Sequence, residues 1–113
     1  MLARIRQFIR TALGVVPTLD LHGLGVREAL IETERFLREA QAHGVKQVRV
    51  VYGKGRGSPG GRGVLRDAVP RWLDGAGAGL IASYRRQPDS SGVDGGALIS
   101  LRTGPAPPRH DAP

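Results

Sequence analysis

Two short motifs, each placed where a strand-like run gives way to glycine, constrain the fold of this chain most strongly. The first is Leu19-Asp20-Leu21-His22-Gly23 and the second is Tyr52-Gly53-Lys54-Gly55. Side chains at positions i and i+2 of a strand project from the same face, so we expect Asp20 and His22 to point the same way. If the two strands are parallel neighbours, both motifs lie at one edge of a sheet.

The apolar patterns along the chain predict the order β-α-β-α-β-β. Strands are predicted over residues 17–21, 45–52, 80–84 and 97–101, and helices over 26–43 and 64–74. Strand–helix–strand units form parallel pairs, whereas the last two strands, joined by the polar segment 85–96, are expected to pair antiparallel. The expected architecture is therefore a two-layer α/β domain with a four-stranded mixed sheet and both helices packed on it.

Glycine and proline punctuate these elements. Gly44 is expected to end the first of these helices as its C′ residue, where a positive φ favours glycine. Residues 53–63 contain six glycines in eleven positions, which predicts a loop. Pro70 interrupts the second helical pattern and predicts a kink or two short pieces.

The chain of 113 residues fits one domain, predicted over residues 17–103. Residues 1–16 form a basic, acid-free amphipathic pattern, which we interpret as a leading helix or arm, with an organelle presequence as the alternative. The Pro-rich segment 104–113 predicts a disordered tail. Cysteine is absent, which excludes disulfides and thiolate zinc sites, and no apolar run approaches the ~20 residues needed to cross a bilayer. We therefore expect a cytoplasmic protein without a membrane partner.

The chain is strongly basic, with a net charge of +7 and a pI of about 11.2. Seven basic residues and one acidic residue lie between positions 46 and 71, whereas residues 26–43 contain three basic and four acidic residues. The positive charge is concentrated around the glycine-rich loop, which favours a polyanionic partner such as nucleic acid over a merely solvated surface.

The residue types of the two motifs suit phosphodiester chemistry. The unperturbed pKa of histidine, ~6.5, suits His22 to acid–base work, and Asp20 is placed to orient it, position a water or bind a metal. Lys54 supplies a compact charge for a phosphate oxygen. The remaining candidates offer backbone N–H groups or track the flanking backbone: Gly53, Gly55, Gly57, Arg56, Arg62 and Arg66.

Each feature also has a simpler explanation. An Asp-x-His pair alone is typical of a turn-capping aspartate and a hydrogen-bonded histidine, a lysine alone is usually solvated, and a glycine-rich loop alone is usually only flexible. Metal ligands are few, so no dedicated metal site is predicted, and a divalent metal cofactor stays open.

In their combination and order, these motifs resemble the Smr (small MutS-related) domain, particularly its short stand-alone bacterial members. The resemblance runs from about Leu19 to Arg102 and includes Val26-Arg27-Glu28-Ala29 and Gly95-Gly96-Ala97-Leu98. It implies a fold like the C-terminal domain of translation initiation factor three. It also implies nicking endonuclease activity on DNA or endonuclease activity on RNA.

Carried over by position, the family's Leu-Asp-x-His motif falls on Leu19, Asp20 and His22, and its Gly-Lys-Gly motif falls on Gly53, Lys54 and Gly55. Many members have His or Thr where this chain has Tyr52. A tyrosine there can hydrogen-bond a phosphate, but its ordinary pKa of ~10 makes it a poor base at neutral pH.

The favoured hypothesis is a small bacterial endonuclease that uses Asp20, His22 and Lys54. The alternative is a non-catalytic module that binds nucleic acid or the ribosome through the same basic edge. A third, weaker hypothesis is an enzyme acting on a phosphorylated metabolite. The sequence leaves the choice of DNA or RNA and the oligomeric state open.

Overall fold

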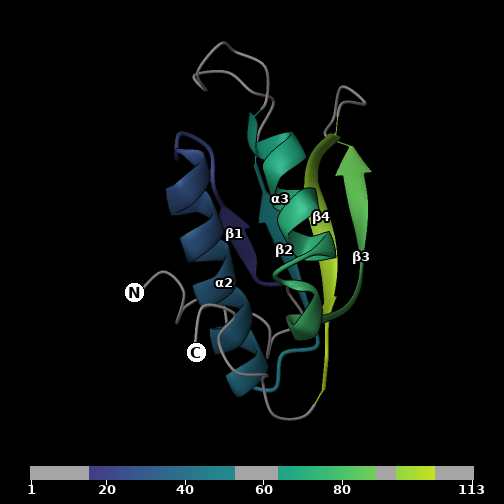
Figure 1. Ribbon diagram of the computed structural model, residues 1–113. Helices are drawn as coiled ribbons and strands as arrows, with labels where there is room; N and C mark the ends of the chain where they lie inside the picture. Colours follow the sequence, from purple (N-terminus) through teal and green to yellow (C-terminus); the bar gives the residue numbers. More distant parts are fainter. Residues whose placement is uncertain (1–15, 53–63, 89–93, 104–113) are drawn as a thin grey trace.

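The computed structural model describes residues 16–52, 64–88 and 94–103 (Figure 1). The elements follow one another as β1 (Thr18–Asp20), α2 (Val26–Ala42), β2 (Gln47–Val51), α3 (Val64–Asp74), the short 3-10 helix η2 (Ala78–Leu80), β3 (Ile81–Pro88) and β4 (Asp94–Leu101). This is the predicted β-α-β-α-β-β order.

The four strands form one mixed sheet in the order β1-β2-β4-β3. Strands β1 and β2 are parallel, with Leu19 opposite Val50. Strand β4 lies antiparallel to both of its neighbours, so that Val50 faces Ala97 and Tyr84 faces Ile99. The prediction of a four-stranded mixed sheet with a parallel first pair and an antiparallel last pair is confirmed.

Both α-helices lie on the same face of this sheet (Figure 1). Burial of their apolar stripes against the strands provides the main stabilisation, at about 1.5–3 kcal/mol for each fully buried large side chain. The largest fully buried apolar side chains in the described residues come from both layers: Phe36, Leu21, Leu37, Leu73, Ile99, Val48, Val50 and Val69. The architecture is therefore the predicted two-layer α/β domain.

Helix α2 ends as the sequence predicts. Gly44 has a φ of +75°, a left-handed conformation that is cheap only for glycine. The backbone N–H groups of Gly44 and Val45 then bond the carbonyls of Gln41 and Ala40 at 3.0 and 2.9 Å. This closure turns the chain directly from α2 into β2.

Helix α3 has the predicted bounds and runs through Pro70 as a single helix, so the predicted alternative of two short pieces is wrong. Pro70 lacks the N–H that would bond the carbonyl one turn earlier, a loss of about 3 kcal/mol in a helix interior. Burial of Leu65, Val69, Pro70 and Leu73 on one side of α3 offsets that loss.

The last two strands are longer than predicted, since most of the polar segment 85–96 belongs to the β3–β4 pair. Arg85 pairs with Leu98 and Gln87 pairs with Gly96. A polar segment is compatible with a strand where one face of the sheet is open to water.

Several predictions concern residues outside the described part of the chain. These are the N-terminal helix or arm of residues 1–16, apart from Val16, the glycine-rich loop of residues 53–63 and the tail of residues 104–113. Among the described helices, none has the length and apolar content that crossing a membrane requires.

Candidate functional site

The candidate site begins at the turn that joins β1 to α2. Leu21 anchors this turn, because its side chain is fully buried and its backbone N–H bonds the Val51 carbonyl at 2.7 Å. The backbone N–H of Leu24 bonds the carbonyl of Leu21 at 3.1 Å, and Gly23 between them has a φ of +83°. The core residue and the glycine together fix where Asp20 and His22 project.

Asp20 and His22 contact each other across this turn. One carboxylate oxygen, Oδ1 of Asp20, accepts a hydrogen bond from the backbone N–H of His22 at 3.0 Å. The same oxygen lies 3.1 Å from Nδ1 of the imidazole. The side chains of His22 and Asp20 are 75% and 58% exposed, so a large substrate has access to both.

This arrangement combines the two readings of the motif. Asp20 caps the turn through the backbone of His22, as the simpler reading expects. It also lies within hydrogen-bond distance of the ring, which is the contact that orients a histidine for acid–base work. In the tautomer with the proton on Nδ1, Oδ1 accepts that proton's hydrogen bond and Nε2 keeps a free lone pair.

The end of β2 lies beside this pair. Asp20 is directly opposite Val51 in the parallel register, and the chain leaves β2 one residue later at Tyr52. The chain therefore enters the glycine-rich segment from the same end of the sheet as the one at which Asp20 lies. The candidate residues of this segment lie outside the described part of the chain, so their convergence with His22 stays a prediction: Gly53, Lys54, Gly55, Arg56, Gly57 and Arg62.

Two helices begin at the same edge of the sheet (Figure 1). Helix α2 starts at Val26 after Gly25, which provides no side-chain cap, and α3 starts at Val64. Helix N-termini carry partial positive charge and unpaired N–H groups, which favour anions. Arg66, half-buried in the first turn of α3, adds a full positive charge there.

Tyr52 has a structural position rather than an exposed one. It is only 3% exposed, and its hydroxyl donates to the Gly96 carbonyl at 3.0 Å. The suggestion that Tyr52 bonds a phosphate does not fit this burial. Its side chain ties the end of β2 to β4 instead.

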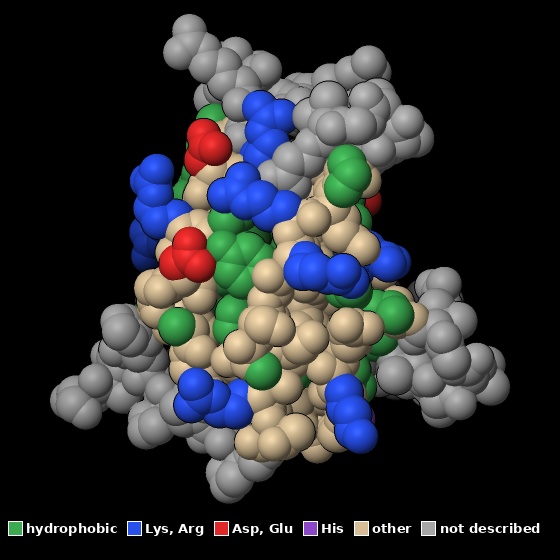
Figure 2. All heavy atoms as spheres, turned by 90° about the vertical axis from the view of Figure 1, so that its right-hand side faces the viewer, with side chains coloured by type: hydrophobic (Ala, Val, Ile, Leu, Met, Phe, Trp, Pro, Cys, Tyr) green, Lys and Arg blue, Asp and Glu red, His purple; other side chains and the backbone are tan. Residues whose placement is uncertain are grey.

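Those members of the basic cluster that lie in the described part of the chain are dispersed in the fold. Lys46 precedes β2 at the opposite end from the motifs, Arg49 lies within β2, and Arg71 is exposed in the last turn of α3. Figure 2, which looks onto the β3 edge, shows Lys and Arg side chains spread over this side with few Asp or Glu side chains between them.

Sequence reasoning missed the arginines of the sheet as candidate binding residues. Directly paired residues share a face, so the register places Arg49 and Arg85 on the side of the sheet away from the helices, together with Asp20. The alternation Val48-Arg49-Val50 carried the signal for Arg49. Arg85 had no such signal, because its segment was assigned to a connection.

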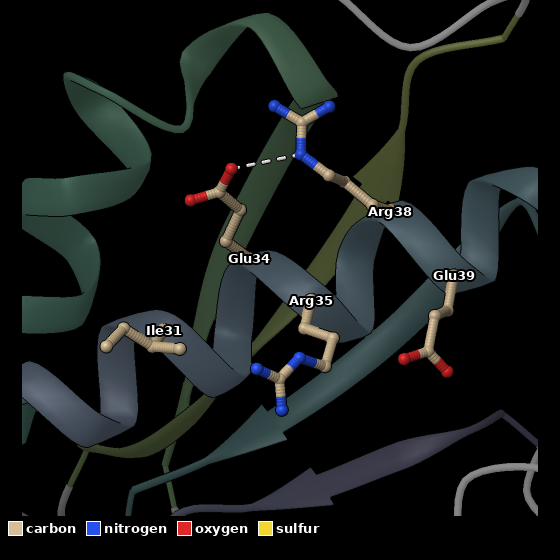
Figure 3. A pocket seen from close by; sticks show the side chains of 5 residues that line it. All are labelled: Ile31, Glu34, Arg35, Arg38 and Glu39. Carbon is tan, nitrogen blue, oxygen red and sulfur yellow. Dashed lines mark hydrogen bonds and ion pairs between the residues drawn. The ribbon is translucent and has the colours of Figure 1, made fainter. Parts of the chain in front are cut away.

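A hollow on the outside of α2 is a weaker candidate (Figure 3). Its charged groups pair along the helix itself: Arg38 donates from Nε to Glu34 at 3.0 Å, and Arg35 donates to Glu32 at 3.0 Å. Such pairs stabilise a helix surface by a few tenths of a kcal/mol each. The residues around this hollow are Ile31, Glu34, Arg35, Arg38 and Glu39.

No group of three or more His, Cys, Asp or Glu side chains suited to a metal ion occurs within the described ranges. Asp20 and His22 form a pair of possible ligands at most. The described site therefore consists of an exposed Asp–His pair at a sheet edge with two helix N-termini.

The chain is a small two-layer α/β domain with an Asp–His turn after its first strand. Comparison with known proteins identifies its family. The family model for the Smr domain matches residues 19–102. The chain therefore belongs to the Smr domain family.

Named relatives and solved structures agree with this assignment. The chain is 40% identical over 87 residues to endonuclease MutS2 of Pelotomaculum thermopropionicum, which covers 77% of this chain and 10% of that protein. Against endonuclease MutS2 of Thermus thermophilus the identity is 34%, over 77% of this chain and 11% of the relative. The chain thus spans about a tenth of the length of these relatives.

The fold resembles the crystal structure of the Smr domain of Thermus thermophilus MutS2, with a TM-score of 0.62 and 34% identity over 78% of this chain and 99% of that one. It also resembles YdaL, a stand-alone small MutS-related protein from Escherichia coli. That match has a TM-score of 0.60 and 28% identity over 76% of this chain and 64% of that one.

Proposed function

We propose that this chain is an endonuclease that hydrolyses phosphodiester bonds in DNA or RNA at the sheet edge where β1 and β2 end. The observation that carries the proposal is the 3.1 Å contact between Nδ1 of His22 and Oδ1 of Asp20. Supporting it, the relatives from Pelotomaculum thermopropionicum and Thermus thermophilus are both named endonucleases.

In this proposal His22 is the acid–base group. With Nδ1–H donating to Asp20, Nε2 is available to take a proton from the attacking water. The oxygen of that water bonds to phosphorus, the bond to the leaving oxygen breaks, and the leaving oxygen takes a proton from solvent water, while the imidazolium later returns its proton to solvent. Asp20 orients the ring and stabilises the imidazolium formed during the reaction.

The proposed phosphate clamp consists of Lys54 and the loop that follows β2. Lys54 binds a non-bridging oxygen, the backbone N–H groups of Gly53, Gly55 and Gly57 approach the same phosphate, and the nearby arginines Arg56, Arg62 and Arg66 bind flanking phosphates. The helix N-termini at this edge support the clamp, because they favour the negative charge that grows on phosphorus in the transition state.

We also propose residues 17–103 as the unit that carries this activity. The described strands and helices lie between Thr18 and Leu101, which supports these bounds. Residues 1–16 and 104–113 contribute none of the proposed site residues.

The proposal is tested by incubating the protein with supercoiled plasmid and with structured RNA, each with and without a chelator. Lys54→Ala is compared with Lys46→Ala, a matched lysine at the other end of β2. We expect nicking or scission by the wild type and by Lys46→Ala, and a loss of about 10-fold or more for Lys54→Ala, because it removes one charge-assisted phosphate contact. Intact plasmid and RNA with every preparation would contradict the proposal.

The alternative, a non-catalytic nucleic-acid-binding module, is favoured by one observation. The bond from the His22 backbone to Asp20 is a complete turn cap that needs no catalytic role. In that case substrates stay intact, while Lys54→Ala still weakens binding to them.

A further inference from the structure

The face of the sheet away from α2 and α3 carries two arginines, Arg49 and Arg85. The register places on this open face one residue from each strand in a straight row: Thr18, Arg49, Leu98 and Arg85. The next row toward the end of β1 consists of Asp20, Val51, Gly96 and Gln87. With strands about 4.8 Å apart, each row crosses about 14 Å of sheet.

Arg49 is held in a defined orientation on this face. Its Nε donates to Oε1 of Gln87 at 3.0 Å, so the side chain reaches from β2 across β4 to β3. Gly96, which has no side chain, lies between them in the row of Gln87. Because Gln87 binds Nε, the two terminal amino groups remain as donors for a phosphate.

Arg85 adds a second, exposed guanidinium two strands away from Arg49, on the other side of Leu98. Among the described strand positions of the open face, Arg49 and Arg85 carry positive charge and Asp20, in contact with His22, carries negative charge. A phosphate chain that crosses the sheet over the two arginines reaches β1 at Thr18, two residues before Asp20 on the same strand.

The described open-face positions contain no aromatic side chain. Tyr84 and Tyr52 lie with the core, and Trp72 packs against it from α3. Aromatic side chains are the usual platforms on which proteins stack unpaired bases, whereas arginine–phosphate contacts carry no sequence information. The chemistry of this face therefore fits the backbone of a nucleic acid rather than its bases.

We propose that the open face of the sheet is the binding track for the sugar-phosphate backbone of the substrate strand. Arg49 and Arg85 bind phosphates, and Gln87 is a positioning residue for Arg49. This inference rests on the proposed function and adds to it that substrate binding is independent of base sequence.

The test measures binding of fluorescent oligonucleotides, one of mixed sequence and one homopolymer, by anisotropy between 50 and 200 mM salt. The variants are Arg49→Gln, Arg85→Gln and their double, with Arg71→Gln on α3 as the matched control and thermal unfolding as the check of folding. Each single variant is expected to weaken binding about 3- to 10-fold. Each is also expected to make the plot of log K against log salt concentration less steep by about one. Arg71→Gln is expected to leave both quantities unchanged.

Gln87→Ala tests whether Gln87 positions Arg49, without changing the charge of the protein. It is expected to weaken binding about 2- to 5-fold, because Arg49 loses its orientation, while the salt slope stays near the wild-type value since no charge is removed. Equal affinity for the two oligonucleotides supports the track. A preference of about 100-fold for one sequence would overturn it, because such discrimination requires base contacts.

The binding track and the endonuclease proposal can be contradicted independently of each other by these experiments. Wild-type affinity in the Arg49→Gln/Arg85→Gln double variant overturns the track, and the endonuclease proposal is then decided separately by the cleavage assay with Lys54→Ala and Lys46→Ala. Weakened binding in the double variant, with no cleavage by the wild type, supports the track and overturns the endonuclease proposal.

Discussion

One carboxylate oxygen contacts both the backbone and the ring of His22: Oδ1 of Asp20 lies 3.0 Å from the backbone nitrogen of His22 and 3.1 Å from its ring Nδ1. The shape of the turn after β1 and the orientation of the imidazole are therefore set by the same atom. A substitution that keeps the oxygen but removes its charge separates the structural role of Asp20 from its electrostatic role.

Asp20→Asn is that substitution. The amide oxygen can still accept from the backbone of His22, so we expect a free energy of unfolding within about 1 kcal/mol of the wild type. Cleavage should fall about 10-fold or more, because the amide no longer stabilises a positive imidazolium. Urea unfolding and a plasmid-nicking assay measure the two effects. Glu39→Gln, near the C-terminal end of α2, is the control, and a wild-type nicking rate in Asp20→Asn would contradict the role given to the charge.

Tyr52→Phe tests whether this tyrosine is structural. It removes the hydroxyl that donates to the Gly96 carbonyl at 3.0 Å in a buried setting. We expect a loss of about 1–2 kcal/mol of unfolding free energy, with cleavage unchanged below the unfolding transition. The reverse outcome, full stability with lost cleavage, would mean that the hydroxyl contacts the substrate.

Gly96→Ala tests the close approach of β2 and β4. A Cβ at this position would lie 2.6 Å from the Val50 carbonyl oxygen, a backbone atom that cannot rotate away. We expect destabilisation by about 1–3 kcal/mol, typical of overpacking, measured by thermal or urea unfolding. Gly25→Ala is the control, since nothing lies within 4 Å of its Cβ, and it should cost less than about 1 kcal/mol. Equal stability of the two variants would show that the sheet can widen at this point.

Tyr84 gives the fold a dependence on alkaline pH. Burial raises the pKa of Tyr84 above its ordinary value, and the hydrogen bond to Asp74 and the charge of that carboxylate raise it further. A tyrosine with a raised pKa in the folded state stays protonated there after the unfolded chain has ionised. The contribution of Tyr84 to the free energy of unfolding is therefore complete below about pH 10 and is lost as the pH rises through the folded-state pKa.

The corresponding measurement is urea unfolding of wild type and Tyr84→Phe at pH 8 and at pH 10.5. The wild type should lose more stability between the two pH values than Tyr84→Phe does. An equal loss in both proteins would place the alkaline sensitivity elsewhere in the chain.

Local patterns were enough to predict most of the fold. The apolar run over residues 45–52 predicted β2, and glycine at position 44 marked the end of α2; the observed strand and the positive φ of Gly44 confirm both. The helix over residues 64–74 was predicted, but whether Pro70 divides it was not, because tertiary burial decides whether the lost hydrogen bond is tolerated. Local preference cannot report that balance.

The face on which the candidate site lies was harder to predict. Strand β4 inserts between β2 and β3, which brings Arg49 and Arg85 to either side of Leu98. This strand order depends on contacts between distant parts of the chain, so no local pattern encodes it. By contrast, the contact of Asp20 with His22 is local, because an aspartate at the start of a turn can accept a hydrogen bond from the backbone N–H two residues on.

The rate of plasmid nicking by His22→Ala tests the central claim most directly. The control is His43→Ala, which removes an exposed histidine at the C-terminal end of α2, purified in parallel. We predict that nicking falls about 10²- to 10⁴-fold in His22→Ala, the range expected for a lost acid–base group, while DNA binding and the His43→Ala rate stay near wild type. Equal nicking by His22→Ala and the wild type would contradict the account.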